Sequence, residues 1–339
     1  MRKLKFAIIG TGNVTNDHIS ALQKVEGAEL THIFGRNKSA LKELANKHNI
    51  LWTTDYNEIL KNPDIDIIDI TLASGLHADF GIKAAKAGKH VIVEKPIDVS
   101  LEKAEALINE CKKHGVTLGV ISQMRFSKGM RKLYNYVSTG KFGEFIQGDA
   151  SIKWYRTQEY YDSGKWRGTY ALDGGGPFIN QAIHYIDLLL SVMGSVKNVY
   201  AKTRTVSHNI EVEDTGIALI EFTNGAQGVI QASTAFFPGL SARLEIHGTK
   251  GTVIFENDEI IFEHFKGDQA FSAINSKKKG GASDPRIINN DLFVRQFEDI
   301  LSAISNKQHP KVNGKEAYKA LQLILAIYKS SVSGQLVDL

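Results

Sequence analysis

The sequence predicts an α/β protein whose first third forms a doubly wound parallel sheet and whose remainder forms a large, mostly antiparallel open sheet. Up to Gln123, short apolar runs rich in β-branched residues alternate with amphipathic stretches of helical period. After Gln123, long runs follow one another with turn residues between them. A third observation is the glycine turn Gly10-Thr11-Gly12, directly after the first apolar run. Alternating strands and helices favour parallel pairing, whereas strands joined by short turns pair antiparallel.

The first part contains five expected strands in which nearly every position is apolar, as in strands that helices cover on both faces. These strands are expected at Leu4–Ile9, Glu29–Phe34, Ile65–Leu72, His90–Val93 and Val116–Ile121, with helices at His18–Val25, Ala40–His48, His77–Ala87 and Leu101–Lys113. Ligands bind at the carboxyl ends of parallel strands. We therefore expect a site at Gly10, Ala73-Ser74-Gly75 and Glu94-Lys95-Pro96.

The second part begins with an expected helix at Lys128–Ser138, followed by Gly140. Asn224-Gly225 stands between two runs and predicts a tight hairpin in which both turn residues have positive φ. The helix expected at Pro177–Val192 has proline in its first turn and Gly194 just past its end. The other expected elements are strands at Phe145–Tyr155, Val196–Val206, Thr215–Phe222, Ala226–Ala235, Ala242–Ile246 and Thr252–Phe255, and helices at Asn290–Ser305 and Lys315–Ser330.

Length and composition limit the classes of function. At 339 residues the chain exceeds the usual size of one core, so we expect domains at 1–123 and 124–339, with C-terminal helices able to pack on the first. The formal charge of +4 and the lack of a long basic run argue against nucleic-acid binding. Cys111 is the only cysteine, and no two histidines stand at i, i+4, so we expect no metal site. Apolar runs too short for a signal or a membrane span predict a cytoplasmic protein.

The glycine turn predicts a dinucleotide site. Gly10 permits a tight turn after the first strand, and Gly12 lets backbone N–H groups at the next helix's N-terminus approach a pyrophosphate. Asn13 and Val14, which follow Gly12, are further candidates for cofactor binding. The third glycine of this fingerprint is replaced by Thr15.

The end of the second strand bears on the choice of cofactor. No acidic residue follows Phe34, and Arg36 with Ser39 could hold a 2′-phosphate, which favours NADP(H) over NAD(H). Alternatively, Arg36 stacks on adenine and either cofactor binds. Ala73, Ser74 and His77 come where ribose or phosphate would pass, although His77 is equally interpreted as a surface residue in a first helical turn.

Two polar residues are candidates for proton transfer. Lys95 precedes Pro96, which favours an extended conformation at Lys95 and allows a cis bond. A lysine beside an oxidised nicotinamide can accept a proton near neutral pH. On the later helix, Asn180, His184 and Asp187 are spaced by four and three and share a face. Gly174-Gly175-Gly176 allows a close approach to a ligand, so we expect a catalytic His184 with Asn180 orienting a hydroxyl.

Aromatic and guanidinium groups gather around Arg156, Tyr160, Trp166 and Arg167. Arginine forks suit carboxylate or diphosphate, and flat rings suit a sugar or base. The alternative is a cluster that packs the sheet against the first domain, and we expect both uses. Ser276-Lys277-Lys278-Lys279-Gly280-Gly281 is interpreted as a surface loop in preference to a lid over an anionic substrate.

Together these motifs resemble the glucose-fructose oxidoreductase, inositol dehydrogenase and MocA superfamily. The resemblance rests on Gly10-x-Gly12, Glu94-Lys95-Pro96, Gln123-Met124-Arg125-Phe126, the triple glycine and His184-Tyr185-Ile186-Asp187. It implies a Rossmann NAD(P)-binding domain, hydride transfer at a sugar or cyclitol carbon, and a homodimer or homotetramer. It also implies that Glu94 and Gln123 belong to the cofactor side and Arg125 to the substrate side. Many members carry aspartate where this chain has Asn180, so Lys95 and His184 remain as the proton-transfer pair.

A narrower resemblance is to UDP-N-acetyl-2-amino-2-deoxyglucuronate 3-dehydrogenases. It lies in Glu159-Tyr160-Tyr161, Trp166-Arg167-Gly168-Thr169, Asn180-Gln181-Ala182 and Asn209-Ile210-Glu211-Val212-Glu213-Asp214-Thr215. This resemblance implies NAD as cofactor and an acidic residue at the end of the second strand, and Gly35-Arg36 departs from that pattern. The resemblance therefore implies an NAD(P)-dependent dehydrogenase that acts on a sugar carbinol, at C3 of a UDP-N-acetylglucuronate-type nucleotide sugar. The alternatives are an inositol or simple aldose dehydrogenase and a non-catalytic NAD(P)-sensing regulator.

Overall fold

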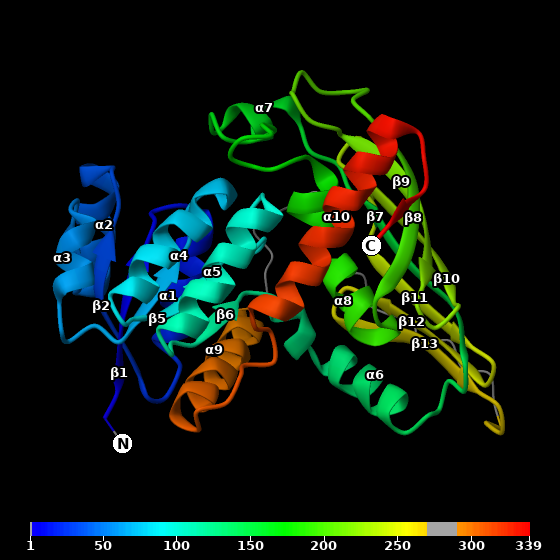
Figure 1. Cartoon of the computed structure of the whole chain (residues 1–339), viewed down its shortest axis with the longest axis horizontal. Helices are drawn as coiled ribbons and strands as arrows, with labels where there is room; N and C mark the ends of the chain where they lie inside the picture. The colour runs from blue at the N-terminus through cyan, green and yellow to red at the C-terminus, as the bar shows by residue number, and fades with distance from the viewer. Residues whose placement is uncertain (1, 270–289) are drawn as a thin grey trace. The chain divides into compact units, whose positions relative to one another are not determined.

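The computed structural model describes residues 2–269 and 290–339 (Figure 1). The chain divides into two compact units, Met1–Gln123 with Asn289–Tyr318, and Met124–Ile288 with Lys319–Leu339. The lysine-rich stretch considered as a lid, around Lys277, lies outside the described residues. Among the helices that the structure describes, none is long and apolar enough to cross a membrane.

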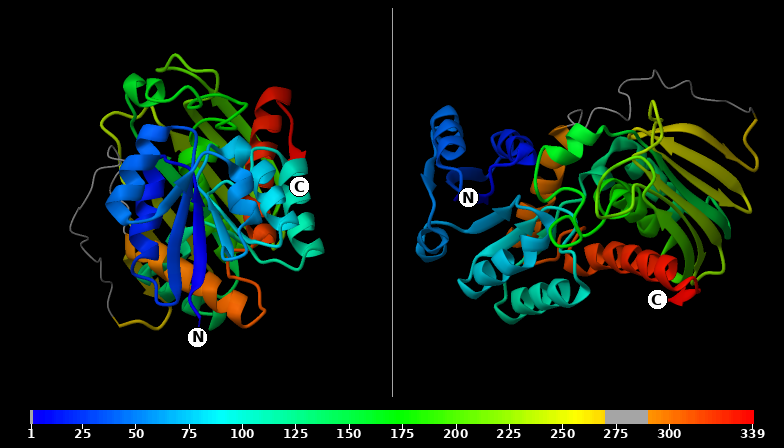
Figure 2. Two further views of the ribbon diagram at one scale, coloured as in Figure 1. Left: turned by 90° about the vertical axis from the view of Figure 1, so that its left-hand side faces the viewer. Right: turned by 90° about the horizontal axis from the view of Figure 1, so that it is seen from above.

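The first unit contains a six-stranded sheet, all parallel, in the order β3-β2-β1-β4-β5-β6. The strand order reverses between β1 and β4, so right-handed crossovers place helices on both faces, as Figure 2 shows. The strands are β1 (Leu4–Ile9), β2 (Ala28–Phe34), β3 (Leu51–Thr53), β4 (Ile67–Ile70), β5 (His90–Val93) and β6 (Leu118–Val120). The helices are α1 (Asn13–Leu22), α2 (Lys38–His48), α3 (Tyr56–Lys61), η1 (Ser74–Leu76), α4 (His77–Lys86), α5 (Leu101–Lys113) and α9 (Asn290–Ser305). The predicted doubly wound sheet is confirmed.

Helix α9 completes the core of this unit although it comes late in the chain. Its Phe293 and Phe297 are fully buried and belong to the cluster that Phe6 and Ile8 of β1 form with α1. Gln296 fixes the helix to the end of β6, because its Oε1 accepts the N–H of Ser122 at 3.0 Å and its Nε2 donates to the carbonyl of Val120 at 2.8 Å.

The second unit contains an eight-stranded sheet in the order β13-β12-β11-β7-β10-β9-β8-β14, in which only β7 and β10 pair in parallel. Its strands are β7 (Phe145–Lys153), β8 (Val196–Arg204), β9 (Thr215–Phe222), β10 (Gln227–Ser233), β11 (Arg243–Gly248), β12 (Gly251–Glu256), β13 (Glu259–Phe265) and β14 (Val337–Asp338). The helical elements wholly within this unit are α6 (Lys128–Ser138), α7 (Gln158–Asp162), η3 (Phe178–Ala182) and α8 (Ile183–Met193). Two more, η2 (Gln123–Phe126) and α10 (Gly314–Ser333), begin in the first unit and end in the second. The mostly antiparallel sheet is as predicted.

Two of the hairpin turns of this sheet differ from the expectation. At Asn224-Gly225 only Gly225 has positive φ, and the Asn224 side chain instead accepts the N–H of Ala226 and donates to the carbonyl of Met193. The prediction of positive φ at both residues is therefore wrong at that turn. The turn that has it joins β12 to β13, at Asn257 and Asp258, with φ of 46° and 70°. Sequence inspection missed β13 because two non-glycine residues fill this turn.

One face of the sheet is covered and the other is exposed. Ala218 and Ile220 of β9 are buried, whereas the alternating Ile217 and Leu219 are 44% and 55% exposed. Tyr200 of β8 pairs with Leu219 in the register and is also exposed. The outer face therefore presents an apolar surface at the centre of β8 and β9.

Candidate active site

The glycine turn lies between β1 and α1 and is fitted to an anionic group. Gly10 has a φ of +133°, and a Cβ there would lie 2.6 Å from Thr71 Oγ1. Gly12 caps α1 without any side-chain hydrogen bond, no acidic residue stands in the first turn, and a Cβ at Gly12 would meet only Thr71 O, at 4.0 Å. The helix start thus offers backbone N–H groups to an anion such as a dinucleotide pyrophosphate. Thr15, in place of the third glycine, is buried with its hydroxyl 2.8 Å from that of Thr71.

The end of β2 carries a cation and no carboxylate. Gly35 is packed against the turn, since its Cβ would lie 3.0 Å from Thr11 Cγ2. Arg36 is exposed, and the next residue, Asn37, caps α2 by accepting the N–H groups of Ser39 and Ala40. Arg36 therefore lies just before the cap of α2 and next to Gly35, and Ser39 lies in the first turn of α2.

His77 is buried at the start of α4 and does not lie on the surface. Ala73 and Ser74 begin η1, and His77 follows at the start of α4 with 1% of its side chain exposed. Its Nδ1 lies 2.7 Å from the carbonyl oxygen of Pro96 and its Nε2 lies 3.0 Å from that of Leu72. The interpretation of His77 as a surface residue is wrong, because the ring joins the end of β4 to the loop that carries Lys95.

Lys95 follows β5 in a loop that is held on both sides. The Lys95–Pro96 peptide is cis. Before it, Glu94 is buried, and its Oε2 accepts the Lys95 N–H at 2.9 Å. After it, the carbonyl of Pro96 meets His77. The Glu94 side chain, expected on the cofactor side, thus supports the lysine backbone.

Gln123 ends the first unit and is a suitable ligand contact. It is 6% exposed, and among the described residues its Oε1 has no hydrogen-bond partner. A buried amide oxygen without a partner is costly unless a bound molecule donates to it. Gln123 and the glycine turn fit the dinucleotide that the sequence predicts.

The helix that carries His184 covers the predicted range, Pro177–Val192. Its first part, η3, is a π-helix, and α8 begins only at Ile183. Single π-helical turns inside helices are frequent at functional sites. Asn180 lies in this turn, and its Nδ2 donates to Asp173 Oδ1 at 2.6 Å. Asp173 is 3% exposed and its Oδ2 accepts the Gly168 N–H at 2.9 Å, so a buried carboxylate fixes the Asn180 side chain.

Glu213 holds the triple glycine in front of this helix. Its carboxylate accepts the N–H groups of Gly176 and Phe178 at 2.8 and 3.2 Å, and the hydroxyl of Tyr328 at 2.9 Å. A Cβ on Gly176 would collide with the Glu213 carbonyl oxygen, so only glycine fits. Burial raises the pKa of Glu213 to about 7, even though these donors lower it.

Arg125, expected to contact substrate, makes a bidentate ion pair with Asp187. Its Nε and Nη2 lie 2.7 and 2.6 Å from the two carboxylate oxygens, and the side chains are 10% and 5% exposed. Such a paired fork is well fixed in position. The ion pair joins η2 to α8. The sequence did not indicate that Asp187 pairs with Arg125.

The expected aromatic and arginine residues come together as a stacked cluster. The Arg167 guanidinium lies 4.4 Å from the ring centre of Tyr160 and 4.6 Å from that of Trp166. Its Nη1 donates to the Tyr160 hydroxyl at 2.8 Å, which Gln181 of η3 also approaches at 3.3 Å. The guanidinium of Arg156, which is 5% exposed, lies 5.5 Å from the same Tyr160 ring. Two guanidinium groups near one ring form a cationic cluster, and Gln181 links it to the helix of His184.

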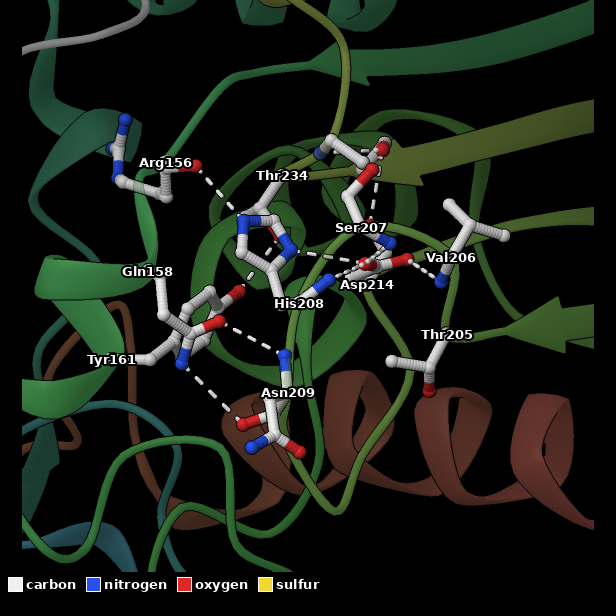
Figure 3. Close-up of polar contacts among 12 residues, drawn as sticks. Arg156, Gln158, Tyr161, Thr205, Val206, Ser207, His208, Asn209, Asp214 and Thr234 are labelled. Carbon is white, nitrogen blue, oxygen red and sulfur yellow. Dashed lines mark hydrogen bonds and ion pairs between the residues drawn. The ribbon is translucent and has the colours of Figure 1, made fainter.

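The Arg156 backbone is supported by a buried dyad that sequence reasoning missed (Figure 3). His208 Nε2 lies 2.9 Å from the Arg156 carbonyl oxygen, and Nδ1 lies 2.9 Å from Asp214 Oδ2. Asp214 also accepts the backbone N–H groups of Val206, Ser207 and His208. The available sequence signal was the adjacent pair Glu213-Asp214 in a run of turn-like residues. Two consecutive carboxylates that are buried need hydrogen-bond donors from other parts of the chain.

Comparison with known proteins identifies the family of the chain. Residues 4–122 match the model of the oxidoreductase family with an NAD-binding Rossmann fold, and residues 130–254 match the GFO/IDH/MocA C-terminal domain. The chain is similar to the WlbA dehydrogenase from Bordetella pertussis, solved with NADH and UDP-GlcNAcA, with 30% identity, a TM-score of 0.89, and 100% and 98% of the two chains covered. The WlbA dehydrogenase from Chromobacterium violaceum, also solved with NADH and UDP-GlcNAcA, is 31% identical, with a TM-score of 0.88. That comparison covers 100% of this chain and 96% of the other.

An inositol enzyme is also similar. The scyllo-inositol 2-dehydrogenase (NAD(+)) of Bacillus subtilis is 28% identical, over 99% of this chain and 96% of the relative. Both domain models, the full-length structural likeness and the glycine turn lead to one conclusion: the chain belongs to the GFO/IDH/MocA family of NAD-binding oxidoreductases.

Proposed function

We propose that this chain is an NAD(P)-dependent dehydrogenase that oxidises C3 of a UDP-N-acetylglucuronate-type nucleotide sugar. The observation that carries the proposal is the cationic cluster of Arg156, Tyr160 and Arg167, which Gln181 links to the helix of His184. Guanidinium groups stacked on aromatic rings suit a diphosphate or a carboxylate, whereas a neutral polyol has no anionic group for them to bind. The likeness to two enzymes solved with UDP-GlcNAcA also supports a nucleotide-sugar substrate.

The proposed chemistry divides between the two units. The bound dinucleotide, held by the glycine turn and Gln123, supplies the hydride acceptor. His184 accepts the proton of the substrate hydroxyl, and Lys95 polarises the same oxygen or shares the role of base. Asn180 orients the hydroxyl, because its amide is fixed by Asp173. The Trp166 ring and the two arginines hold the acidic part of the substrate.

The purified protein should reduce NAD⁺ or NADP⁺ with UDP-N-acetylglucosaminuronate and show a much lower kcat/KM with myo-inositol. Arg167→Ala should raise KM for the nucleotide sugar at least about tenfold and change kcat less, since a charge-assisted hydrogen bond is worth about 1.5–3 kcal/mol. Lys165→Ala, two residues away and exposed, is the matched control. Equal kcat/KM with inositol, or an unchanged KM in Arg167→Ala, would contradict the substrate assignment.

For the cofactor, we propose that Arg36 lets the protein bind NADPH at least as tightly as NADH. The end of β2 has no carboxylate that would repel a 2′-phosphate, and Arg36 is exposed there. Fluorescence titration should show that Arg36→Gln weakens NADPH binding by about tenfold and NADH binding by less than about threefold. Lys38→Gln, on the same exposed turn, should change neither. Preference of the wild-type protein for NADH would refute this proposal and leave the dehydrogenase proposal intact.

Two further parts of the proposal concern the alternatives and assembly. A regulator that only senses NAD(P) would bind cofactor without turning over any sugar, so the same assay separates it from an enzyme. Assembly into a homodimer or homotetramer stays a prediction. We propose that the exposed face around Leu219 is the interface. Light scattering measures the oligomeric state of the protein in solution.

A further inference from the structure

A buried ionic cluster lies behind Lys95 and involves residues outside the catalytic proposal. His18 of α1, Asp69 of β4 and Glu94 at the end of β5 are 0%, 0% and 7% exposed. His18 Nδ1 lies 2.7 Å from Asp69 Oδ2, and His18 Nε2 lies 3.0 Å from Glu94 Oε1. The ring also packs on Phe293 and Phe297 of α9, with centres 5.1 and 5.4 Å apart. Charged groups at such a depth persist only when they are paired.

The geometry fixes the charge of the imidazole. Each ring nitrogen faces a carboxylate, and carboxylates accept hydrogen bonds, so both nitrogens carry a proton when both contacts are made. Burial alone would lower the pKa of His18, but Asp69 and Glu94 raise it to about 10. On α1, burial raises the pKa of the neighbouring Asp17, which the charge of His18 lowers and that of Glu94 raises. The cluster therefore holds one cation between two anions.

Glu94 links this cluster to the reaction centre. Its Oε1 is held by His18, and its Oε2 accepts the N–H of Lys95 at 2.9 Å. Because both carboxylate oxygens are held, the Glu94 side chain is fixed in one orientation. It therefore also fixes the orientation of the Glu94–Lys95 peptide, whose N–H it accepts. Helix α1, which carries His18, begins directly after the glycine turn, and Thr71, just after β4, contacts Gly10.

We propose that Glu94, anchored by the buried His18, is a positioning residue that holds the Lys95 backbone for catalysis. This inference rests on the proposed function, because it assumes that Lys95 acts on substrate. Small displacements of a reacting group lower kcat more than they lower binding. A cluster that served only stability would change unfolding and leave kcat unaffected at temperatures where the variants are folded.

Three substitutions separate the two roles. Glu94→Ala removes the support of the Lys95 N–H, and we expect kcat to fall at least about tenfold with little change in the dissociation constant of NADH. Glu94→Gln should rescue kcat to within about threefold, because its amide oxygen accepts the Lys95 N–H while its amide nitrogen donates to a neutral His18. Asp69→Asn perturbs the same buried ring on the side away from Lys95 and should keep kcat, although it lowers the melting temperature.

A double-mutant cycle tests whether His18 acts through Glu94. His18→Gln should lower kcat in the wild-type background and add little in the Glu94→Ala background. The proposal is overturned if the two effects multiply, if Glu94→Ala leaves kcat unchanged, or if kcat falls in proportion to melting temperature in all variants.

Hydrogen exchange provides a readout that needs no substrate. With the cofactor-free protein, residue-resolved mass spectrometry should show the Lys95 amide exchanging at least about tenfold faster in Glu94→Ala, and near the wild-type rate in Glu94→Gln and Asp69→Asn. Unchanged exchange in Glu94→Ala would refute the positioning role. If exchange behaves as expected but no sugar is oxidised, the proposed function fails and the local role of Glu94 stands.

Discussion

Alanine in place of His184 is expected to lower kcat for the nucleotide sugar at least about a hundredfold, the usual effect of losing general acid–base help. The same loss is expected for Lys95→Ala, because the two side chains share the removal of one proton. The effect should fall on kcat, since cofactor and the acidic end of the substrate are held by other residues. Steady-state rates with saturating cofactor, together with NADH titration, measure it.

The controls separate lost chemistry from lost structure. His184→Asn retains a polar side chain but no titratable nitrogen, so it should be as slow as His184→Ala while it binds NADH normally. The double variant Lys95→Ala with His184→Ala should be little slower than either single variant, because residues acting as a unit are not additive. Near-normal turnover in either single variant would remove that residue from the proposed mechanism.

Glu213 is expected to make the stability of the protein fall as the pH rises above about 5. Burial raises the folded-state pKa of this carboxyl from 4.5 to about 7, so the folded protein favours the neutral form. The resulting stabilisation is fully present below pH 4.5 and is lost as the pH rises through about 7. The full effect is on the order of 3 kcal/mol for a shift of this size.

Chemical denaturation at about pH 5 and about pH 8 measures this linkage as a difference between two proteins. Glu213→Gln cannot ionise, so its free energy of unfolding should gain on that of the wild type as the pH rises. Glu211→Gln, two residues earlier and exposed, is the matched control. Parallel pH profiles for wild type and Glu213→Gln would show that the Glu213 carboxyl titrates alike in the folded and unfolded states.

The comparison of expectation and structure shows which signals are local. The alternation of apolar runs and helical patterns gave β1, β5, α5, α6 and α9 with the observed bounds, because burial on a sheet face imposes a fixed period on neighbouring residues. The short edge strand β3 was missed, since three residues with Leu51 65% exposed carry no such pattern. The π-helical turn at Asn180 was also missed, because its cause lies in contacts with distant residues.

Local sequence patterns therefore predict the architecture and the chemical groups of the candidate site. Glycines at a strand end, a lysine before proline and a histidine after three glycines are such patterns, because each restricts the backbone where it stands. The contacts that support these groups form only in the folded chain. His18 contacts Glu94 across 76 residues, and Tyr328 contacts Glu213 across 115. A buried charge needs a partner that is close in space, and the residues beside it in the sequence do not indicate which residue that partner is.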